Sequence, residues 1–173
     1  MSPPCCKRRD NEVMSLKFFY GLVLLALINV AGAQVVGQGA GYHDPRSPFK
    51  PLEERSGVVS WSVLASVANR VEKNKLIAVY PAAVQALNQQ KIKVQGFMMP
   101  LEPGDKQNHF LLSSVPTTCT FCVPAGPEGL VEVRTRQPVR YTVEPVTVEG
   151  VLAVLIDDPY GLFYRVDDAK AVP

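Results

Sequence analysis

At 173 residues the chain has the length of one domain, and 47% of its side chains are hydrophobic, which excludes an intrinsically disordered composition. The formal net charge of +2 comes from 18 basic and 16 acidic side chains, and the basic excess lies before residue 34. From residue 34 onward the charges balance, with 14 of each sign. Because no basic cluster remains to contact phosphates, we expect no nucleic-acid partner.

The N-terminal region has the pattern of a secretory signal peptide. Lys17 precedes a 13-residue apolar run, Phe18–Val30, and a short Ala-Gly-Ala sequence ends at Ala33. The run is shorter than the roughly 20 apolar residues of a membrane-spanning helix. We predict cleavage after Ala33 and a periplasmic or secreted location in the bacterial envelope, with translation starting at Met1 or at Met14. A retained leader would instead anchor the chain in the inner membrane, which is its only expected membrane contact.

The composition divides the chain into three parts. Residues 1–33 form the leader, residues 34–57 a flexible linker rich in glycine and proline, and residues 58–173 a single β-rich domain. The linker shows no apolar periodicity, as is typical of a tether or of an arm that follows the protein surface. We interpret His43, within the linker, as a solvated side chain.

The first part of the domain is predicted to be helical. Val58–Val71 places Trp61 among apolar residues at helical spacing, and Ser60 can cap the helix. Leu76–Val79 has the character of a short strand. Pro81–Leu87 begins with proline, which suits the first turn of a second short helix.

A two-residue periodicity follows and predicts strands. In chain order these are Lys91–Phe97, Phe110–Val115, Leu130–Arg136, Tyr141–Thr147, Val148–Ile156 and Leu162–Val166. Gly96 and Gly150 lie inside apolar strands, which indicates the tight coiling of a small barrel. The predicted fold is mainly β with short helices (α+β): an OB-like or Greek-key barrel of five or six strands, with the helical segment Val58–Leu87 packed outside. An open five-stranded α+β sandwich is the alternative.

One motif carries chemistry. Cys119 and Cys122 are the only cysteines after the leader, and they lie in a loop rich in proline and glycine. A Cys-x-x-Cys turn supplies two ligands for Zn²⁺ or Cu(I), and His109 is the candidate third ligand. Asp105, Glu128 or a partner protein would have to complete such a site.

Two other interpretations of the cysteine pair remain open. A structural disulfide would staple a tight loop in an oxidising compartment, with a stabilisation on the order of 2 kcal/mol. A redox dithiol needs a helix N-terminus that lowers the pKa of the first thiol. Pro124 and Pro127 follow the motif directly, which disfavours a thioredoxin-type enzyme. From the residues alone the disulfide is favoured over metal binding, and both over redox exchange.

No established catalytic motif is present in the sequence. Asp157-Asp158 and Asp167-Asp168 are adjacent carboxylates, and neighbours in an extended chain point to opposite faces. We interpret both pairs as turn-forming, solvated residues and expect no enzymatic activity.

The domain resembles a bacterial envelope family of unknown function, domain-of-unknown-function family 3299. The resemblance covers roughly Val58–Val172, and its most specific parts are Gly96–Leu101 (GFMMPL) and the Cys119 loop. The cysteine loop of this chain resembles that of the family members, which is also followed by prolines. The members often have Cys-x-His where this chain has Cys119-x-x-Cys122. Because that exchange preserves a soft metal ligand but not a disulfide, the resemblance favours a metal site.

The resemblance also implies a function. The family is similar to accessory proteins that accompany envelope transporters. The resemblance therefore implies a periplasmic accessory protein that acts through the Cys119–Cys122 loop. Such a protein would bind a metal ion, zinc or copper, or would assist an envelope transporter or another periplasmic protein. A thiol-disulfide redox protein and a scaffold with a stapled loop are the alternatives.

Overall fold

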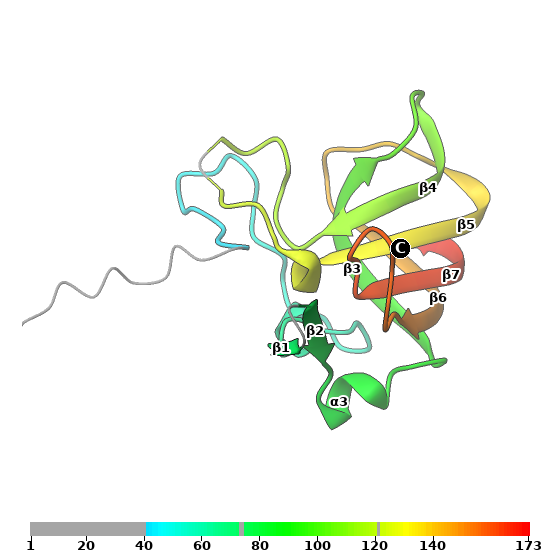
Figure 1. Cartoon of the computed structure of the whole chain (residues 1–173). Coiled ribbons are helices and arrows are strands. Elements are labelled where there is room, and N and C mark those ends of the chain that lie inside the picture. The colour runs from blue at the N-terminus through cyan, green and yellow to red at the C-terminus, as the bar shows by residue number, and fades with distance from the viewer. Residues whose placement is uncertain (1–40, 73–74, 121) are drawn as a thin grey trace, which may run out of the picture. The chain divides into compact units, whose positions relative to one another are not determined.

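The computed structural model of the chain describes residues 41–72, 75–120 and 122–173 (Figure 1). The predicted leader, its cleavage site and the first part of the predicted linker lie outside these residues. In the described part of the chain, no helix is long and apolar enough to span a membrane.

Five strands close into a barrel (Figure 1). They are β3 (Lys91–Pro100), β4 (Lys106–Ser113), β5 (Leu130–Arg140), β6 (Val146–Val154) and β7 (Tyr164–Val172). Their order around the barrel is β3-β4-β5-β7-β6, and β6 pairs with β3 to complete the circle. All pairs are antiparallel except β5 with β7. This is the strand order of an OB-type barrel. The predicted barrel is therefore confirmed, and the alternative prediction, an open sandwich, was wrong.

Apolar side chains from all five strands fill the barrel. The fully buried ones include Val94, Phe110, Leu112, Val131, Val133, Val148, Leu152, Tyr164 and Val166. Full burial of one large apolar side chain contributes about 1.5–3 kcal/mol to folding. The alternating pattern of the sequence therefore forms strands because closure removes one face of each strand from water.

Two glycines permit the close approach of neighbouring strands. A Cβ atom at Gly150 would lie 2.6 Å from a methyl group of Val166 and 2.7 Å from the carbonyl oxygen of Asp167. A Cβ atom at Gly96 would lie 2.9 Å from the carbonyl oxygen of Ser113. The expectation that these glycines serve a tightly coiled sheet is confirmed by the space around them.

The segment before the barrel is less helical than predicted. It contains α2 (Trp61–Leu64), β1 (Ala68–Glu72), β2 (Lys75–Val79) and α3 (Ala82–Gln85). Ser60 does cap α2, since its hydroxyl accepts a hydrogen bond from the Ser62 amide. However, the predicted helix Val58–Val71 was wrong beyond its first turn, because residues 68–72 pair antiparallel with β2. β-Branched residues such as Val67 and Val71 favour that outcome.

Two strand predictions in the second half of the domain also need correction. Residues 141–145 form a loop, and the strand predicted at Tyr141–Thr147 exists only as the start of β6 at Val146. In contrast, β7 continues past Val166 and runs through the Asp167-Asp168 pair that we expected in a turn. Asp168 adopts a φ of 54° where the pairing with β6 is irregular, a conformation that Asp tolerates better than most residues.

Residues 41–57, called the arm below, contain no helix or strand but lie against the domain. The Gly41 amide donates to the carbonyl oxygens of Val123 (3.2 Å) and Pro124 (3.1 Å), and the Val123 amide donates to Tyr42 O at 3.0 Å. Phe49 packs edge-on against Phe97 of β3, with ring centroids 6.3 Å apart. The arm is thus attached to the domain at its start and, through Phe49, near its middle.

Candidate functional site

The two cysteines form a disulfide in the loop between β4 and β5. Cys119 and Cys122 have Cα atoms 5.4 Å apart, and Cys119 is only 8% exposed. Residues 114–129, called the disulfide loop below, are closed at their base by a 3.0 Å hydrogen bond from the Ser114 amide to Gly129 O. A disulfide between Cys119 and Cys122, one of the three interpretations of the pair, is therefore confirmed.

The structure does not bring the predicted metal ligands together. Both sulfur atoms are bonded to each other, so neither is a free thiolate. His109 lies on β4, where its Nε2 is 2.7 Å from Oε1 of Glu132, and Asp105 lies in the loop before β4. In the described residues, no three His, Cys, Asp or Glu side chains are grouped as metal ligands. A metal role for Cys119 and Cys122 would require that the disulfide first be reduced.

The surroundings of the disulfide also differ from those of a redox dithiol. The next helical element is a short 3-10 turn, η2 (Pro127–Gly129), so the first cysteine does not begin a helix. Cys119, which would be the attacking thiol, is buried, whereas Cys122 is half-buried. Both the position and the burial are those of a loop staple.

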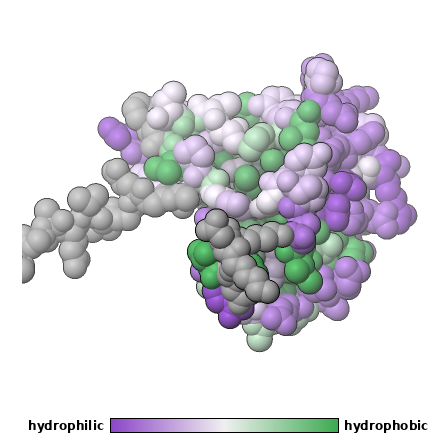
Figure 2. All heavy atoms as spheres, in the orientation of Figure 1, coloured by the Kyte–Doolittle hydropathy of each residue, from purple (hydrophilic) through white to green (hydrophobic). Residues whose placement is uncertain are grey.

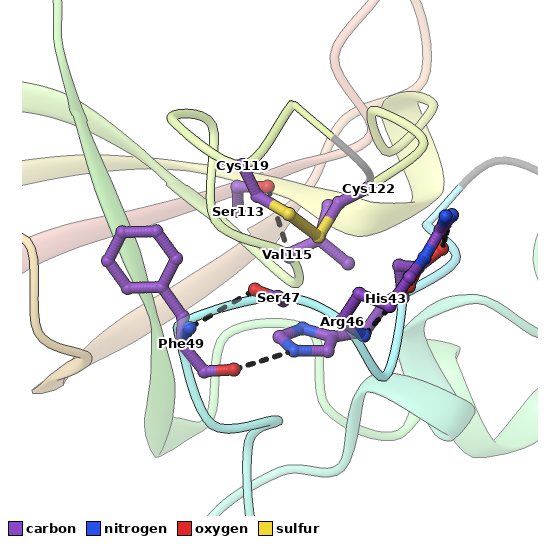
Figure 3. Close-up of a disulfide and its surroundings, with 9 residues drawn as sticks. His43, Arg46, Ser47, Phe49, Ser113, Val115, Cys119 and Cys122 are labelled. Atoms are coloured by element: carbon purple, nitrogen blue, oxygen red, sulfur yellow. Dashed lines mark hydrogen bonds and ion pairs between the residues drawn. A yellow bond between two sulfur atoms is a disulfide. The ribbon is translucent and has the colours of Figure 1, made fainter.

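The arm, α2 and the disulfide loop together enclose a cleft of about 340 Å³. The volume is within the range of small-ligand sites. Its apolar wall comes from the arm, from residues around α2 and from the disulfide loop: Leu52, then Val58, Val59, Trp61 and Ala65, and Val115. In Figure 3 the arm residues His43, Ser47 and Phe49 lie below the disulfide, with Val115 beside it.

Hydrogen bonds order the arm internally and join α2 to the barrel at the edge of the cleft. Trp61 Nε1 donates to Gln95 O on β3 at 2.8 Å, and His43 Nε2 lies 2.9 Å from Phe49 O. Asp44 is buried and accepts from the side chain and the amide of Arg46. These hydrogen bonds lower the pKa of Asp44 from 3.8 to about 2. The cleft is thus largely preformed.

The charged residues of the cleft are mostly acidic. Glu53, Glu54 and Glu128 line it, against one cation, Arg55. Glu128 is half-buried, and its carboxylate packs over Gly126. A Cβ atom on Gly126 would lie only 2.5 Å from Oε1 of Glu128. Because carboxylates outnumber cationic side chains in its lining, the cleft attracts cationic groups.

A second polar cluster lies on the outer surface of the barrel. Glu132 on β5 is buried. The alternation of the strand predicts a solvent-facing side chain at this position, on the face opposite to Val131 and Val133. Its carboxylate also contacts Arg134 and Arg165. Hydrophilic residues gather over the side of the molecule where Figure 1 places β4 and β5 (Figure 2).

Comparison with known proteins places the chain in a family. A family model described as a protein of unknown function, DUF3299, matches residues 51–159, which is more than half of the chain. The chain belongs to the DUF3299 family. This confirms the resemblance. The matched residues include the α2 wall of the cleft, the disulfide loop, and both His109 and Glu132. They exclude the arm before Pro51 and strand β7.

A solved DUF3299 structure is similar to this chain. The crystal structure of a DUF3299 family protein from Pseudomonas aeruginosa PAO1 has 24% sequence identity, and the superposition has a TM-score of 0.44. It covers 56% of this chain and 68% of that one. Comparison with curated proteins gives no match.

Sequence reasoning missed most of the cleft. The arm was expected to be a linker, so neither Leu52 nor Glu53 was predicted to line a site. Glu128 was considered only as a metal ligand. The one signal available was the acidic Glu53-Glu54 pair next to apolar residues.

Proposed function

We propose that this DUF3299 chain is an exported, non-catalytic binding module that holds a basic segment of an envelope partner protein in the cleft. The observation that carries the proposal is the preformed cleft with three glutamates and one arginine along its apolar wall. Lys and Arg side chains combine an apolar stem with a cationic head, so they suit a site that offers both surfaces. An envelope transporter is the kind of partner that the family resemblance favours.

The disulfide has a structural role in this proposal. It lies in the disulfide loop, whose two ends, near Val115 and Glu128, line the cleft. By shortening the free part of that loop it reduces the conformational freedom lost when a ligand binds. A disulfide of this kind persists in an oxidising compartment, which agrees with an exported chain. Cell fractionation together with mass analysis after thiol alkylation tests both points. Cytoplasmic protein with two free thiols after Ala33 would contradict the proposal.

Binding to the cleft can be measured with fluorescent ten-residue peptides rich in Lys and Arg, and with acidic peptides of the same length. We expect saturable binding of the basic peptides only. Glu128→Gln removes the half-buried charge of the cleft and should weaken binding several-fold at low salt. Glu102→Gln, an exposed residue outside the cleft, is the matched control. Equal binding by both variants, or by both peptide types, would rule out the proposed site.

The metal hypothesis requires a separate measurement. Calorimetric titration with Zn²⁺ and Cu(I) should be carried out on the oxidised and on the reduced protein. Stoichiometric binding that appears only after reduction and is lost in Cys119→Ser would support a metal function of the cysteines. Without such binding, the disulfide is a structural staple.

A further inference from the structure

Glu132 is the most unusual charged residue of the barrel surface. Its side chain is only 7% exposed, although it is on the outside of β5. His109 Nε2 lies 2.7 Å from its carboxylate, Arg134 donates through Nη2 at 2.9 Å, and Arg165 Nη1 is 3.7 Å away. The four side chains come from β4, β5 and β7. They therefore form one fixed polar network across three neighbouring strands.

A loop with exposed apolar side chains borders this network. Residues 155–163 join β6 to β7, and both Ile156 and Tyr160 are 88% exposed. The loop is nevertheless anchored: the Leu155 amide donates to Phe163 O at 2.9 Å. Asp158 Oδ1 accepts from the Tyr160 amide at 3.0 Å. Tyr160 is thus presented to solvent by a hydrogen-bonded loop, as an arrangement prepared for a ligand would be.

The network and the loop share a groove of about 500 Å³. The groove contains two cations, Arg134 and Arg165, against Glu132, Asp157 and Asp158. A polyanion such as nucleic acid would meet more negative than positive charge there. In OB-type barrels the face of the second and third strands, here β4 and β5, with its flanking loops binds oligonucleotides or oligosaccharides. The charge balance favours the second class.

We propose that this groove binds a neutral, hydroxyl-rich saccharide, at a site separate from the acidic cleft. Tyr160 offers a flat face on which the apolar side of a sugar ring can stack. Arg134, which is 52% exposed, and the carboxylates at the edge of the groove supply donors and acceptors for ring hydroxyls. The saccharide lies along β5 and under the loop, with the Glu132 network as its base.

The test is calorimetry or ligand-detected NMR with three soluble probes: maltohexaose, chitohexaose and, as a polyanion, a decathymidine strand. We expect saturable binding of at least one hexasaccharide and none of the DNA. Tyr160→Ala should weaken binding about three- to ten-fold, the size of one lost aromatic contact. Tyr141→Ala, on a partly exposed tyrosine outside the groove, is the matched control.

Circular dichroism distinguishes a lost contact from a lost fold, and the exposure of Tyr160 leads us to expect an unchanged spectrum. No saccharide binding, binding of the DNA alone, or equal affinity in Tyr160→Ala and wild type would each overturn the proposal. If Glu128→Gln weakened saccharide binding and Tyr160→Ala left it unchanged, the sugar would lie in the cleft, which also overturns the proposal. Because peptide binding is measured separately, either site can fail without the other.

Discussion

The hydroxyl of Tyr164 connects the barrel to the segment outside it. Tyr164 is fully buried at the start of β7, and its Oη donates a 2.6 Å hydrogen bond to Leu64 O at the end of α2, 100 residues earlier. Tyr164→Phe keeps the ring and its packing against Tyr80 but leaves the Leu64 carbonyl without this donor in a buried position. An unsatisfied buried polar group costs about 1–3 kcal/mol. We expect a loss of that size in the free energy of unfolding.

Urea denaturation of the oxidised protein measures the effect. With an m-value of about 2 kcal/mol/M, a loss of about 2 kcal/mol lowers the midpoint by about 1 M. Tyr160→Phe is the matched control, because that hydroxyl belongs to a highly exposed side chain. If both variants shift the midpoint equally, the reasoning about Tyr164 is refuted.

The same residue predicts an alkaline limit of stability. Burial raises the pKa of Tyr164 above its usual value of 10.0, and the nearby Tyr80 and Glu128 raise it further. Above pH 10 the unfolded chain therefore releases this proton before the folded chain does, so stability falls as the pH rises. Tyr164→Phe should flatten that fall. An unchanged slope above pH 10 would show that other groups cause it.

Three further predictions concern the barrel, the loop and the arm. Gly150→Ala should cost about 1–3 kcal/mol of stability in urea denaturation because its Cβ would overlap Val166 and the strand backbone; an unchanged midpoint would contradict the close approach. The Cys119→Ser/Cys122→Ser double variant should lose about 2 kcal/mol, from closure of a very short ring, but keep the far-ultraviolet spectrum of the barrel. Because the pKa of Asp44 is depressed to about 2, the stability it contributes is present above pH 4 and is lost as the pH falls through 2. Asp44→Asn should remove that part of the acid dependence, and identical acid titrations of the two proteins would exclude it.

The barrel was predictable because its strands carry a clear two-residue periodicity and two glycines at points of close approach. The errors occurred where local pattern and tertiary pairing disagree. Trp61, Leu64 and Ala68 have helical spacing, yet Ala68 pairs with Val79 of β2. Asp167-Asp168 has the pattern of a turn, but Asp167 pairs with Val151 of β6, and the residues on either side of the dipeptide pair with β5, which keeps it within β7.

The candidate sites were less predictable than the fold. The disulfide was one of three possibilities at Cys119 and Cys122, because sequence spacing does not show whether a third ligand is near. His109 was expected to approach the cysteines and instead meets Glu132 across a strand pair. Glu132 was assigned to the solvent-facing side because two of the side chains that cover it, His109 and Arg165, are distant in sequence, and no local pattern reveals them.

Closure of the barrel has a consequence for how quickly the chain folds. The pair that completes the circle joins Lys91 to Val151, and the parallel pair joins Glu132 to Arg165, so both need contacts between distant parts of the chain. Topologies of this kind fold on the order of milliseconds to seconds. The disulfide spans three positions within the first connection and lies outside the second. Because loop-closure entropy depends only weakly on loop length, oxidation before or after barrel assembly should change the rate of closure very little.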